Sequence, residues 1–493
     1  EKRRRRKRGT YPDIQERIFI NPEVCEGCGD CGMQSNCVAI LPIETAFGRK
    51  RAIDQSSCNK DFSCRKGFCP SFVTVEGGSL RADKMDHLDL GSIQEPDRLL
   101  TSSDTHNIVI TGIGGTGIVT IGTLLALAGK EEKKYVGIME MAGLAQKGGE
   151  VHVHCKISKK KSGISAIRVA EGQADAIIGG DLLVTASEKA LNLAKNNRTR
   201  IVCNMNDLVT GDFTRDPNFH MDTDSMKVSL VARSLKDSVW FINSTELAKT
   251  YLGDTIFSNI ILLGFAFQAG LIPLKVVSLE AAFKKQFHDF EKNIRAFNVG
   301  RYLFKNNESS NNLTSSSSKK MCDENSAYGS AYEVRKDRLI AFCGNELAQK
   351  YEKKVTAAYN LDEKLGQAVM NGYFCVLYQK DEYEVARLHL NYLKLFLNKT
   401  FSSYKKLKFH LAPPLLSFGK RNSRPKKYAF GEWVLLVFKL LVFLKPLRHT
   451  RFDVFGMSRE RKLAKKLVTL YEEDLTFIFE NFSKEKSRDF LNL

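Results

Sequence analysis

Short apolar runs alternate with helix-like stretches through the middle of the chain. The segment NIVITGIGGTGIVTIGTLLALAG, residues 107–129, predicts a strand, a tight glycine turn and a helix in that order. Each of the later apolar runs KYVGIMEM, VHVHCKI, DAIIGG and RIVCNM has the length of a buried strand. This alternation predicts a Rossmann-like α/β domain with a parallel sheet covered by helices, over residues 105–300.

The regions on either side have different patterns, so we expect a multidomain α/β protein. Residues 18–79 are rich in cysteine and glycine and show little helical periodicity, which predicts a small fold held together by metal rather than by an apolar core. Residues 1–17 and the Ser/Asn-rich residues 306–320 read as linkers. Residues 321–493 are helical, basic and aromatic in pattern, and predict a mainly α C-terminal domain.

Charge and hydropathy narrow the class of protein. The formal net charge is +19, and the densest basic run is KRRRRKR at residues 2–8. No interleaved aromatic residues accompany this run, so a solvated connector is favoured over a nucleic-acid-binding arm. The longest apolar run, WVLLVFKLLVFL, is interrupted by Lys439 and is shorter than the ~20 residues that a membrane span needs. With no signal-peptide pattern, we expect the protein in the reducing cytoplasm. We also expect a homo-oligomer that has no membrane span and no nucleic-acid partner.

The cysteine-rich region is the first candidate site. Two successive C-x-x-C steps and a distant Cys-Pro pair are typical of the thiolates that hold a [4Fe-4S] cluster in bacterial ferredoxins. This pattern predicts one cluster on Cys25, Cys28, Cys31 and Cys69. The remaining Cys37, Cys58 and Cys64 are one thiolate short of a second such cluster, so Asp61 is a candidate fourth ligand, and one or two clusters are possible. A zinc site is the alternative, because C-x-x-C pairs also bind zinc.

The glycine turn is the second candidate site, with Gly112, Gly114, Gly115, Thr116 and Gly117 as its residues. Such a turn brings backbone amides at a helix start close to a phosphate, and Glu140 follows where a dinucleotide fold carries its ribose-binding carboxylate. A turn that only allows close packing is the alternative, and the compressed G-x-G-G-x-G spacing speaks against NAD. The strand histidines His152 and His154, with Cys155 nearby, could bind a metal, but polar packing is the favoured interpretation.

These motifs resemble a known family when taken in order. VCEGCGDCGMQSNC, then GRKRAIDQSSCNKDFSCRKGFCPSFVTVEGG, then ITGIGGTGIVTIGTLLALA with GLAQKGGEVHVHCKI, resemble the long single-chain indolepyruvate ferredoxin oxidoreductases of the 2-oxoacid:ferredoxin oxidoreductase family. The resemblance extends through DEYEVARLHL, LKFHLAPPLL and FDVFG, and so covers nearly the whole chain. It implies a ferredoxin-like segment, a gamma-type catalytic domain and an appended helical domain.

The resemblance implies oxidative decarboxylation of an aryl 2-oxoacid, with coenzyme A as the acyl acceptor and ferredoxin as the electron acceptor. It also implies that thiamine diphosphate and Mg bind to domains preceding this sequence, so that we expect a fragment, inactive by itself, that pairs with the thiamine diphosphate-binding part. The Gly112–Gly117 turn becomes a candidate cradle for coenzyme A phosphate. No catalytic residue is assigned. The alternatives are an iron-sulfur NAD- or flavin-linked reductase and a zinc-stabilised nucleic-acid-binding protein.

Overall fold

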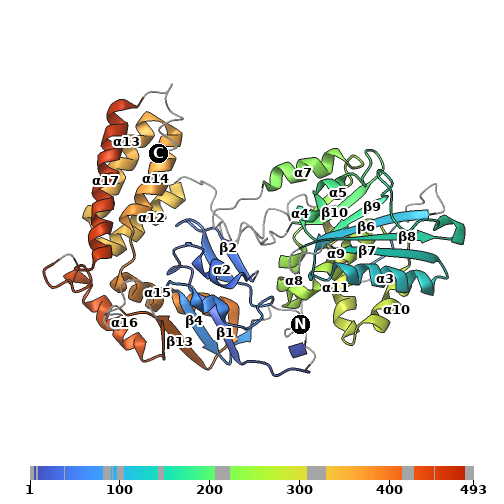
Figure 1. Cartoon of the computed structure of the whole chain (residues 1–493), viewed down its shortest axis with the longest axis horizontal. Helices are drawn as coiled ribbons and strands as arrows, with labels where there is room; N and C mark the ends of the chain where they lie inside the picture. Colours follow the sequence, from blue (N-terminus) through green and yellow to red (C-terminus); the bar gives the residue numbers. More distant parts are fainter. Residues whose placement is uncertain are drawn as a thin grey trace. The chain divides into compact units, whose positions relative to one another are not determined.

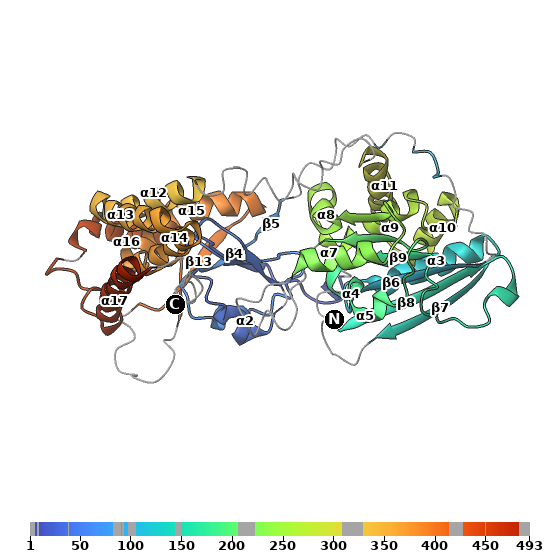
Figure 2. The same cartoon turned by 90° about the horizontal axis from the view of Figure 1, so that it is seen from above.

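The chain folds into two units, which are described one at a time. The computed structural model describes residues 5–6, 9–37, 39–81, 90, 93–96, 105–142, 149–205, 222–307, 329–413, 427–448 and 450–482. One unit joins residues 1–79 to residues 322–493, and the other comprises residues 80–321 (Figures 1 and 2). Most of the basic run at residues 2–8 and the Ser/Asn-rich linker beyond residue 307 lie outside the described residues.

Residues 80–321 contain the α/β domain predicted from the apolar runs. Its six-stranded sheet has the order β11-β10-β9-β6-β8-β7. The strands are β6 (Thr105–Ile113), β7 (Tyr135–Ala142), β8 (Glu150–Ser158), β9 (Ala176–Gly179), β10 (Arg200–Asn204) and β11 (Val239–Ile242). Strands β6, β9, β10 and β11 are parallel, which confirms the predicted parallel sheet. One strand differs from that prediction, because β8 lies antiparallel between β6 and β7.

Helices cover both faces of this sheet (Figure 1). They are α3 (Ile118–Glu131), α4 (Leu182–Thr185), α5 (Glu188–Leu191), α7 (Thr223–Ala232), α8 (Ser244–Leu252), α9 (Ser258–Gln268), α10 (Val276–Gln286) and α11 (Phe290–Asn307), with short 3-10 turns η3 (Lys161–Gly163) and η4 (Thr255–Phe257). Successive strand residues face opposite cores: Ile108, Ile110 and Ile178 pack toward α3, α9, α10 and α11, while Val109 and Ile177 belong to the second core. This two-sided burial explains why the strands are continuous apolar runs.

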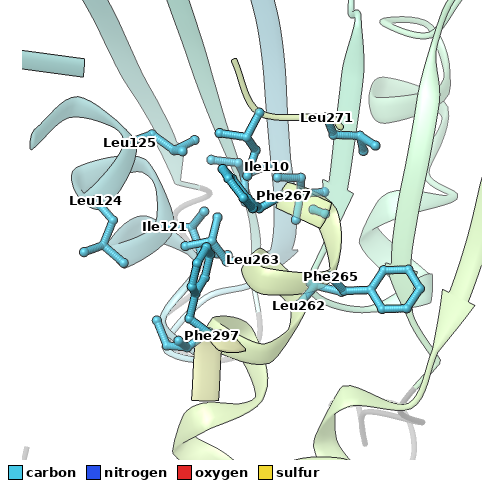
Figure 3. Close-up of a cluster of buried hydrophobic side chains, with 14 of the residues drawn as sticks. Ile110, Ile121, Leu124, Leu125, Leu262, Leu263, Phe265, Phe267, Leu271 and Phe297 are labelled. Carbon is cyan, nitrogen blue, oxygen red and sulfur yellow. The ribbon is translucent and has the colours of Figure 1, made fainter. Parts of the chain in front are cut away.

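The larger core is built where α3, α9 and α11 meet the sheet. Side chains from these three helices and from β6 gather there, and those labelled in Figure 3 include Ile110, Ile121, Leu125, Leu263, Phe267 and Phe297. These six side chains are at most 1% exposed. The carboxyl ends of β6 and β9, which carry the glycine turn and the start of α4, are fixed against this core.

The cysteine-rich region and the C-terminal region share one sheet in the other unit. Its order is β1-β4-β13-β14, with antiparallel pairing throughout. The register sets Val73 opposite both Phe19 and Phe409. In β13, Leu407 and Phe409 are buried while Lys406 is exposed, the alternation of a half-buried strand. The sequence indicated a mainly α domain after residue 321, and the structure adds short strands to its helices.

The remaining elements of this unit surround that sheet. The strands are β1 (Glu16–Ile20), β2 (Ile40–Ile43), β3 (Lys50–Ile53), β4 (Phe72–Glu76), β5 (Ser79–Leu80), β12 (Phe401–Ser403), β13 (Lys406–Leu411) and β14 (Tyr428–Phe430). The helices are α2 (Asp30–Ser35), α12 (Gly329–Cys343), α13 (Asn345–Leu361), α14 (Glu363–Leu377), α15 (Glu382–Thr400), α16 (Val434–Phe443) and α17 (Arg459–Asn481), with 3-10 turns η1 (Ser63–Lys66) and η7 (Lys445–Leu447). None of the described helices is long and apolar enough to cross a membrane.

Candidate metal centre and glycine turn

Four thiols form what we call the first thiol group: Cys25, Cys28, Cys31 and Cys69. Cys25 and Cys31 are 4% and 6% exposed, and Cys69 lies just before β4. Burial, together with negative charge on Cys69, Cys25 and Cys28, raises the pKa of the Cys31 thiol to about 12. The other three cysteines that the sequence grouped as ligands thus interact electrostatically with Cys31.

Three thiols form the second thiol group: Cys37, Cys58 and Cys64. Burial raises the pKa of the Cys64 thiol to about 12, and Cys58, Cys37 and Asp61 add to the rise. Asp61 is thus a neighbour of this group, as its candidacy requires. Its Oδ1 also accepts hydrogen bonds from the Ser63 amide at 3.0 Å and the Ser63 hydroxyl at 2.8 Å, which fixes the start of η1.

Backbone amides donate to two of the thiols, and a serine hydroxyl lies within hydrogen-bond distance of a third. The amide of Gly27 donates to Cys25 Sγ at 3.3 Å, and the amide of Lys60 donates to Cys58 Sγ at 3.4 Å. Cys69 Sγ lies 2.9 Å from Ser71 Oγ. Gly67 separates the two groups, and a Cβ there would lie 2.9 Å from Cys31 Cα, so only glycine allows this close approach. Hydrogen bonds to sulfur stabilise thiolates and are one of the means by which proteins adjust iron-sulfur clusters.

The donor set fits an iron-sulfur cluster by its chemistry, because thiolates are the ligands that hold such clusters. Among the described residues, no three His, Cys, Asp or Glu side chains converge closely enough to hold one metal ion. A tetrahedral zinc with Zn–S bonds of about 2.3 Å draws its four sulfurs to within ~4 Å of one another. A four-iron cluster holds its thiolates farther apart, because the irons and sulfides lie between them. Metal analysis of the chain therefore distinguishes these two kinds of site.

A groove of about 680 Å³ opens beside the second thiol group. Its lining combines cations, one carboxylate and two aromatic rings: Gln34, Asp61, Phe62, Ser63, Arg65, Lys66, Gly67, Phe68 and Lys427. Phe68 is 57% exposed, and the Arg65 guanidinium lies 4.9 Å from the Phe62 ring centre. This is a basic surface with an exposed aromatic residue at its edge.

The glycine turn joins β6 to α3 at the carboxyl end of the parallel strands. Gly112 and Gly115 have different roles in it. A Cβ on Gly112 would lie 2.6 Å from the Ile118 side chain and 3.2 Å from Asp181 Oδ2, so that glycine serves close packing. Gly115 has φ +89° and no heavy atom within 4 Å of where a Cβ would lie, and both Gly115 and Thr116 are exposed. The packing interpretation thus holds for the buried part of the turn, and the exposed part leaves room for a ligand.

Buried polar side chains fix the shape of this turn. Asp181 Oδ2 accepts from the Ile113 amide at 2.7 Å, and its Oδ1 accepts from the Val184 amide at 2.8 Å at the start of α4. Burial raises the pKa of the Asp181 carboxyl. Asn259 Nδ2 donates to the Thr116 carbonyl at 2.9 Å. Because β6 leads to β7 on one side and β9 lies on the other, the turn occupies the switch point where α/β sheets bind ligands.

Glu140 lies apart from the glycine turn. It is exposed on β7, and the inserted strand β8 separates β7 from β6. In a dinucleotide fold the acidic residue ends a strand adjacent to the first strand. The structure therefore does not bring Glu140 to the turn in the way that a ribose-binding carboxylate requires.

The histidines of β8 are packing residues in this structure. His154 Nδ1 accepts from the Val169 amide at 3.1 Å, and burial lowers the His154 pKa to about 4. His152 Nε2 lies 3.8 Å from Glu150 Oε2. Cys155 is fully buried in the core on the opposite face, so these three side chains do not share a site.

Two cations near the thiols were missed by the sequence analysis. Lys380 donates from Nζ to the Cys25 carbonyl at 3.1 Å, and Lys427 donates from Nζ to the Cys69 carbonyl at 2.6 Å. Each lies more than 350 positions from its partner along the chain. No local motif marks either lysine, so their positions near the thiols could be found only from the three-dimensional structure.

Comparisons with known proteins match the α/β domain and the C-terminal region separately. A family model described as pyruvate ferredoxin/flavodoxin oxidoreductase matches residues 107–303. A family of unknown function, DUF6537, matches residues 330–493. The first match covers the α/β domain, and the second covers the C-terminal region whose strands complete the cysteine sheet.

Relatives of known name match about 40% of the chain. The indolepyruvate oxidoreductase subunit IorB of Archaeoglobus fulgidus is 26% identical over 198 residues, which are 39% of this chain and 92% of that protein. The subunit of the same name from Methanothermobacter thermautotrophicus is 25% identical over 198 residues, 40% of this chain and 95% of that protein. Among solved structures, pyruvate oxidoreductase subunit PORC of Thermotoga maritima is 17% identical, with a TM-score of 0.30, over 40% of this chain and 96% of that one.

Proposed function

We propose that this chain, whose residues 107–303 match the pyruvate ferredoxin/flavodoxin oxidoreductase family model, is a gamma-type member of the 2-oxoacid:ferredoxin oxidoreductase family and part of an indolepyruvate-type, aryl 2-oxoacid oxidoreductase. The proposed reaction converts the 2-oxoacid and coenzyme A into an acyl-CoA and carbon dioxide, releasing two electrons and one proton. A separate part of the enzyme holds thiamine diphosphate and Mg, and this chain passes the electrons on to ferredoxin.

The observation that carries the proposal is the division of seven thiols into groups of four and three. The first thiol group supplies the ligand number of a [4Fe-4S] cluster, and the pKa of Cys31 responds to the other three members. A cluster held there takes up and releases single electrons. The second thiol group, with Asp61 beside it, is the proposed site of a further centre.

The basic groove is the proposed docking site of the electron acceptor. Arg65, Lys66 and Lys427 line it next to the second thiol group, and Phe68 adds an exposed apolar contact. A small acidic carrier protein is attracted by such a surface and orients on it before electron transfer. We therefore assign ferredoxin docking to this groove.

The glycine turn is the proposed binding site of coenzyme A. Gly115 and Thr116 are exposed at the amino end of α3, a helix of 14 residues, where backbone amides and the helix dipole favour an anion. The buried Asp181 and Asn259 hold the turn from behind. We assign the phosphates of coenzyme A to this turn, while Glu140 has no role in the proposal.

The test is metal analysis of the anaerobically purified chain. We expect about four or eight iron atoms with matching acid-labile sulfide per chain, and visible absorbance that bleaches with dithionite. Zinc without sulfide would contradict the electron-transfer role and support a structural zinc site instead. Binding of NADH in place of coenzyme A would favour the reductase alternative.

A further inference from the structure

Three side chains from the C-terminal region reach the segment that carries the first thiol group. Lys427 and Lys380 donate to the carbonyls of Cys69 and Cys25 at 2.6 and 3.1 Å. His389 of α15 bonds through Nε2 to the Pro70 carbonyl at 3.1 Å. The region that matches a family of unknown function thus forms hydrogen bonds with the backbone near Cys25 and near Cys69, the first and last members of the first thiol group.

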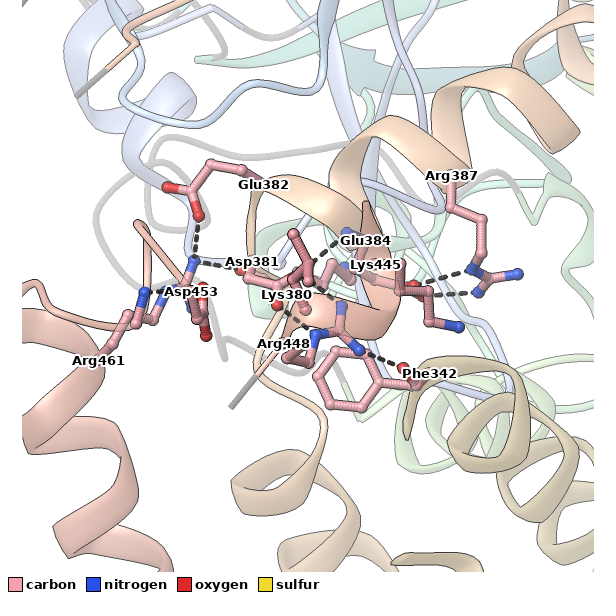
Figure 4. A network of polar contacts seen from close by, with 12 residues as sticks. Phe342, Lys380, Asp381, Glu382, Glu384, Arg387, Lys445, Arg448, Asp453 and Arg461 are labelled. Atoms are coloured by element: carbon pink, nitrogen blue, oxygen red, sulfur yellow. Dashed lines mark hydrogen bonds and ion pairs between the residues drawn. The ribbon is translucent and has the colours of Figure 1, made fainter. Parts of the chain in front are cut away.

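Lys380 is held in place by a polar network (Figure 4). Its own carbonyl accepts from Arg461 Nη2 of α17 at 3.0 Å. The next residue, Asp381, accepts two hydrogen bonds from the Arg448 guanidinium at 2.6 and 2.7 Å. Asp381 also caps α15 by accepting from the Glu384 amide at 2.8 Å. The ammonium of Lys380 therefore has a fixed position rather than a mobile one.

Lys427 lies beside Cys69 and Phe72. Its ammonium lies 4.5 Å from the centre of the Phe72 ring. Burial lowers the pKa of Lys427, and the opposing negative charges come first from Cys69, then from Asp30, Cys31 and Cys64. Members of both groups are thus within electrostatic range of this one cation.

More cations come from β3, and burial makes all of them costly. Lys50 and Arg51 are 6% and 2% exposed, and the Lys380 side chain is 4% exposed. Cys31 and Cys25 are among the negative charges that act on Arg51, while Glu26 and Cys25 act on Lys50. Burial of a cation is unfavourable unless a negative charge compensates for it. Lys380 has one such partner in Glu26 at 3.2 Å, and a negatively charged centre on the first thiol group would add to this compensation.

A buried cation acts more strongly on a centre whose charge changes. Adding one electron to a cluster adds one negative charge, and a nearby cation in a low-dielectric interior stabilises that added charge. Net charge around a cluster is among the factors that set its reduction potential. Removal of such a cation therefore makes the cluster harder to reduce.

We propose that Lys427 and Lys380 are positioning cations that raise the reduction potential of the centre on the first thiol group, so that the C-terminal region serves as a potential-setting module. The proposal rests on the proposed function, since it requires that the centre be an iron-sulfur cluster. Lys427 has the larger expected effect, because its ammonium lies 2.6 Å from the Cys69 carbonyl oxygen, whereas that of Lys380 lies 3.1 Å from the Cys25 carbonyl oxygen.

The experiment is a potentiometric titration of the full chain, followed by electron paramagnetic resonance under anaerobic conditions. The variants are Lys427→Met, Lys380→Met and the charge-conserving Lys427→Arg. Lys462→Met removes the same charge from an exposed position on α17 and is the matched control. We expect Lys427→Met to lower the ratio of reduced to oxidised cluster at a fixed potential about tenfold, which is 59 mV for one electron.

The controls separate the possible failures. Lys427→Arg and Lys462→Met should leave the midpoint close to that of the parent chain, and Lys380→Met should lower it. If Lys427→Met loses iron, Lys380→Met decides the matter with its own titration. A midpoint that is unchanged in every methionine variant that keeps its full iron content overturns this inference and leaves the proposed function intact. A parent chain without iron and sulfide overturns the proposed function as well.

Discussion

At the scale of single residues, Cys31 and Cys64 make a matched pair. Both are buried, at 6% and 7% exposed, and burial raises the pKa of each thiol to about 12. Their neighbours differ, since Cys31 lies among the first thiol group and Cys64 among the second. The iron content of a variant at each of these two cysteines therefore shows which thiol group holds which metal centre.

We expect Cys31→Ser to remove about four iron atoms per chain, because it deletes one of four ligands of a [4Fe-4S] cluster. Cys64→Ser should retain those irons and lose only those of the second group. Cys343→Ser, at an exposed cysteine of α12 in the same unit, is the control and should retain all iron. Equal losses in the Cys31 and Cys64 variants would contradict the division into two groups.

A second prediction at this scale concerns acid stability of the α/β domain. His154 is 2% exposed, and its folded-state pKa is lowered to about 4 from an ordinary 6.5. Between these values the unfolded chain binds more protons than the folded chain, so stability is full above pH 6.5 and falls as the pH drops toward 4. We expect a loss on the order of 1–2 kcal/mol in the free energy of unfolding between pH 7 and pH 5.

Urea unfolding at several pH values measures this loss. The chain has two tryptophans, so a Trp433→Phe background leaves Trp240 of β11 as the reporter for the α/β domain. His154→Gln should show a shallower pH dependence than its parent between pH 7 and pH 5. Identical slopes would show that His154 is not the group responsible.

At the scale of elements, two glycines set the contact between α9 and α11. A Cβ on Gly264 would collide with the backbone of Phe297, and a Cβ on Gly300 would collide with the backbone of Ile261. Backbone atoms cannot rotate away as side chains can. The two helices thus pack more closely than larger residues would permit.

We expect Gly264→Ala to destabilise the α/β domain by about 1–3 kcal/mol or more through overpacking. Gly129→Ala in α3 is the comparison, because its Cβ would meet the Val136 side chain rather than backbone. Since that side chain can shift and the variant gains helix propensity of up to about 1 kcal/mol, it should be destabilised less than Gly264→Ala. Urea midpoints in the Trp433→Phe background compare the two, and equal midpoints would contradict the close contact of α9 with α11.

The sequence predicted elements better than it predicted their pairing. The strand, glycine turn and helix at residues 107–129 were predicted, since a buried parallel strand and the following helix are both encoded locally. The antiparallel direction of β8 was not, because an apolar run carries no information about direction. The strand pairing of Thr74 with Lys408 was also missed, since no local pattern links such distant segments. For the same reason the thiols could be grouped by spacing, while Lys380 and Lys427 could not be found.

At the scale of the whole molecule, the net charge of +19 favours an acidic partner. Long-range attraction between exposed charges is screened over about 10 Å at 0.1 M salt. We expect the rate of ferredoxin reduction by the assembled enzyme to fall about tenfold or more between about 50 and 500 mM NaCl.

Lys66 tests whether the basic groove provides this attraction. Lys66→Glu reverses an exposed charge in the groove and should lower the rate at low salt while reducing its salt dependence. Lys462→Glu makes the same change on α17 and should alter the rate less. A rate that does not respond to salt would remove the electrostatic argument for the groove.

The pairing of β4 with β13 also orders events during synthesis. Thr74 and His410, whose side chains bond at 2.7 Å, are 336 residues apart. At roughly 5–20 residues per second, the ribosome needs roughly 20 s to a minute to make that length of chain. The cysteine segment therefore leaves the ribosome well before the strand that pairs with it, and the entire α/β domain has time to fold in between. The completed surroundings of the thiols are a late product of translation, although the thiols themselves are among the first residues made.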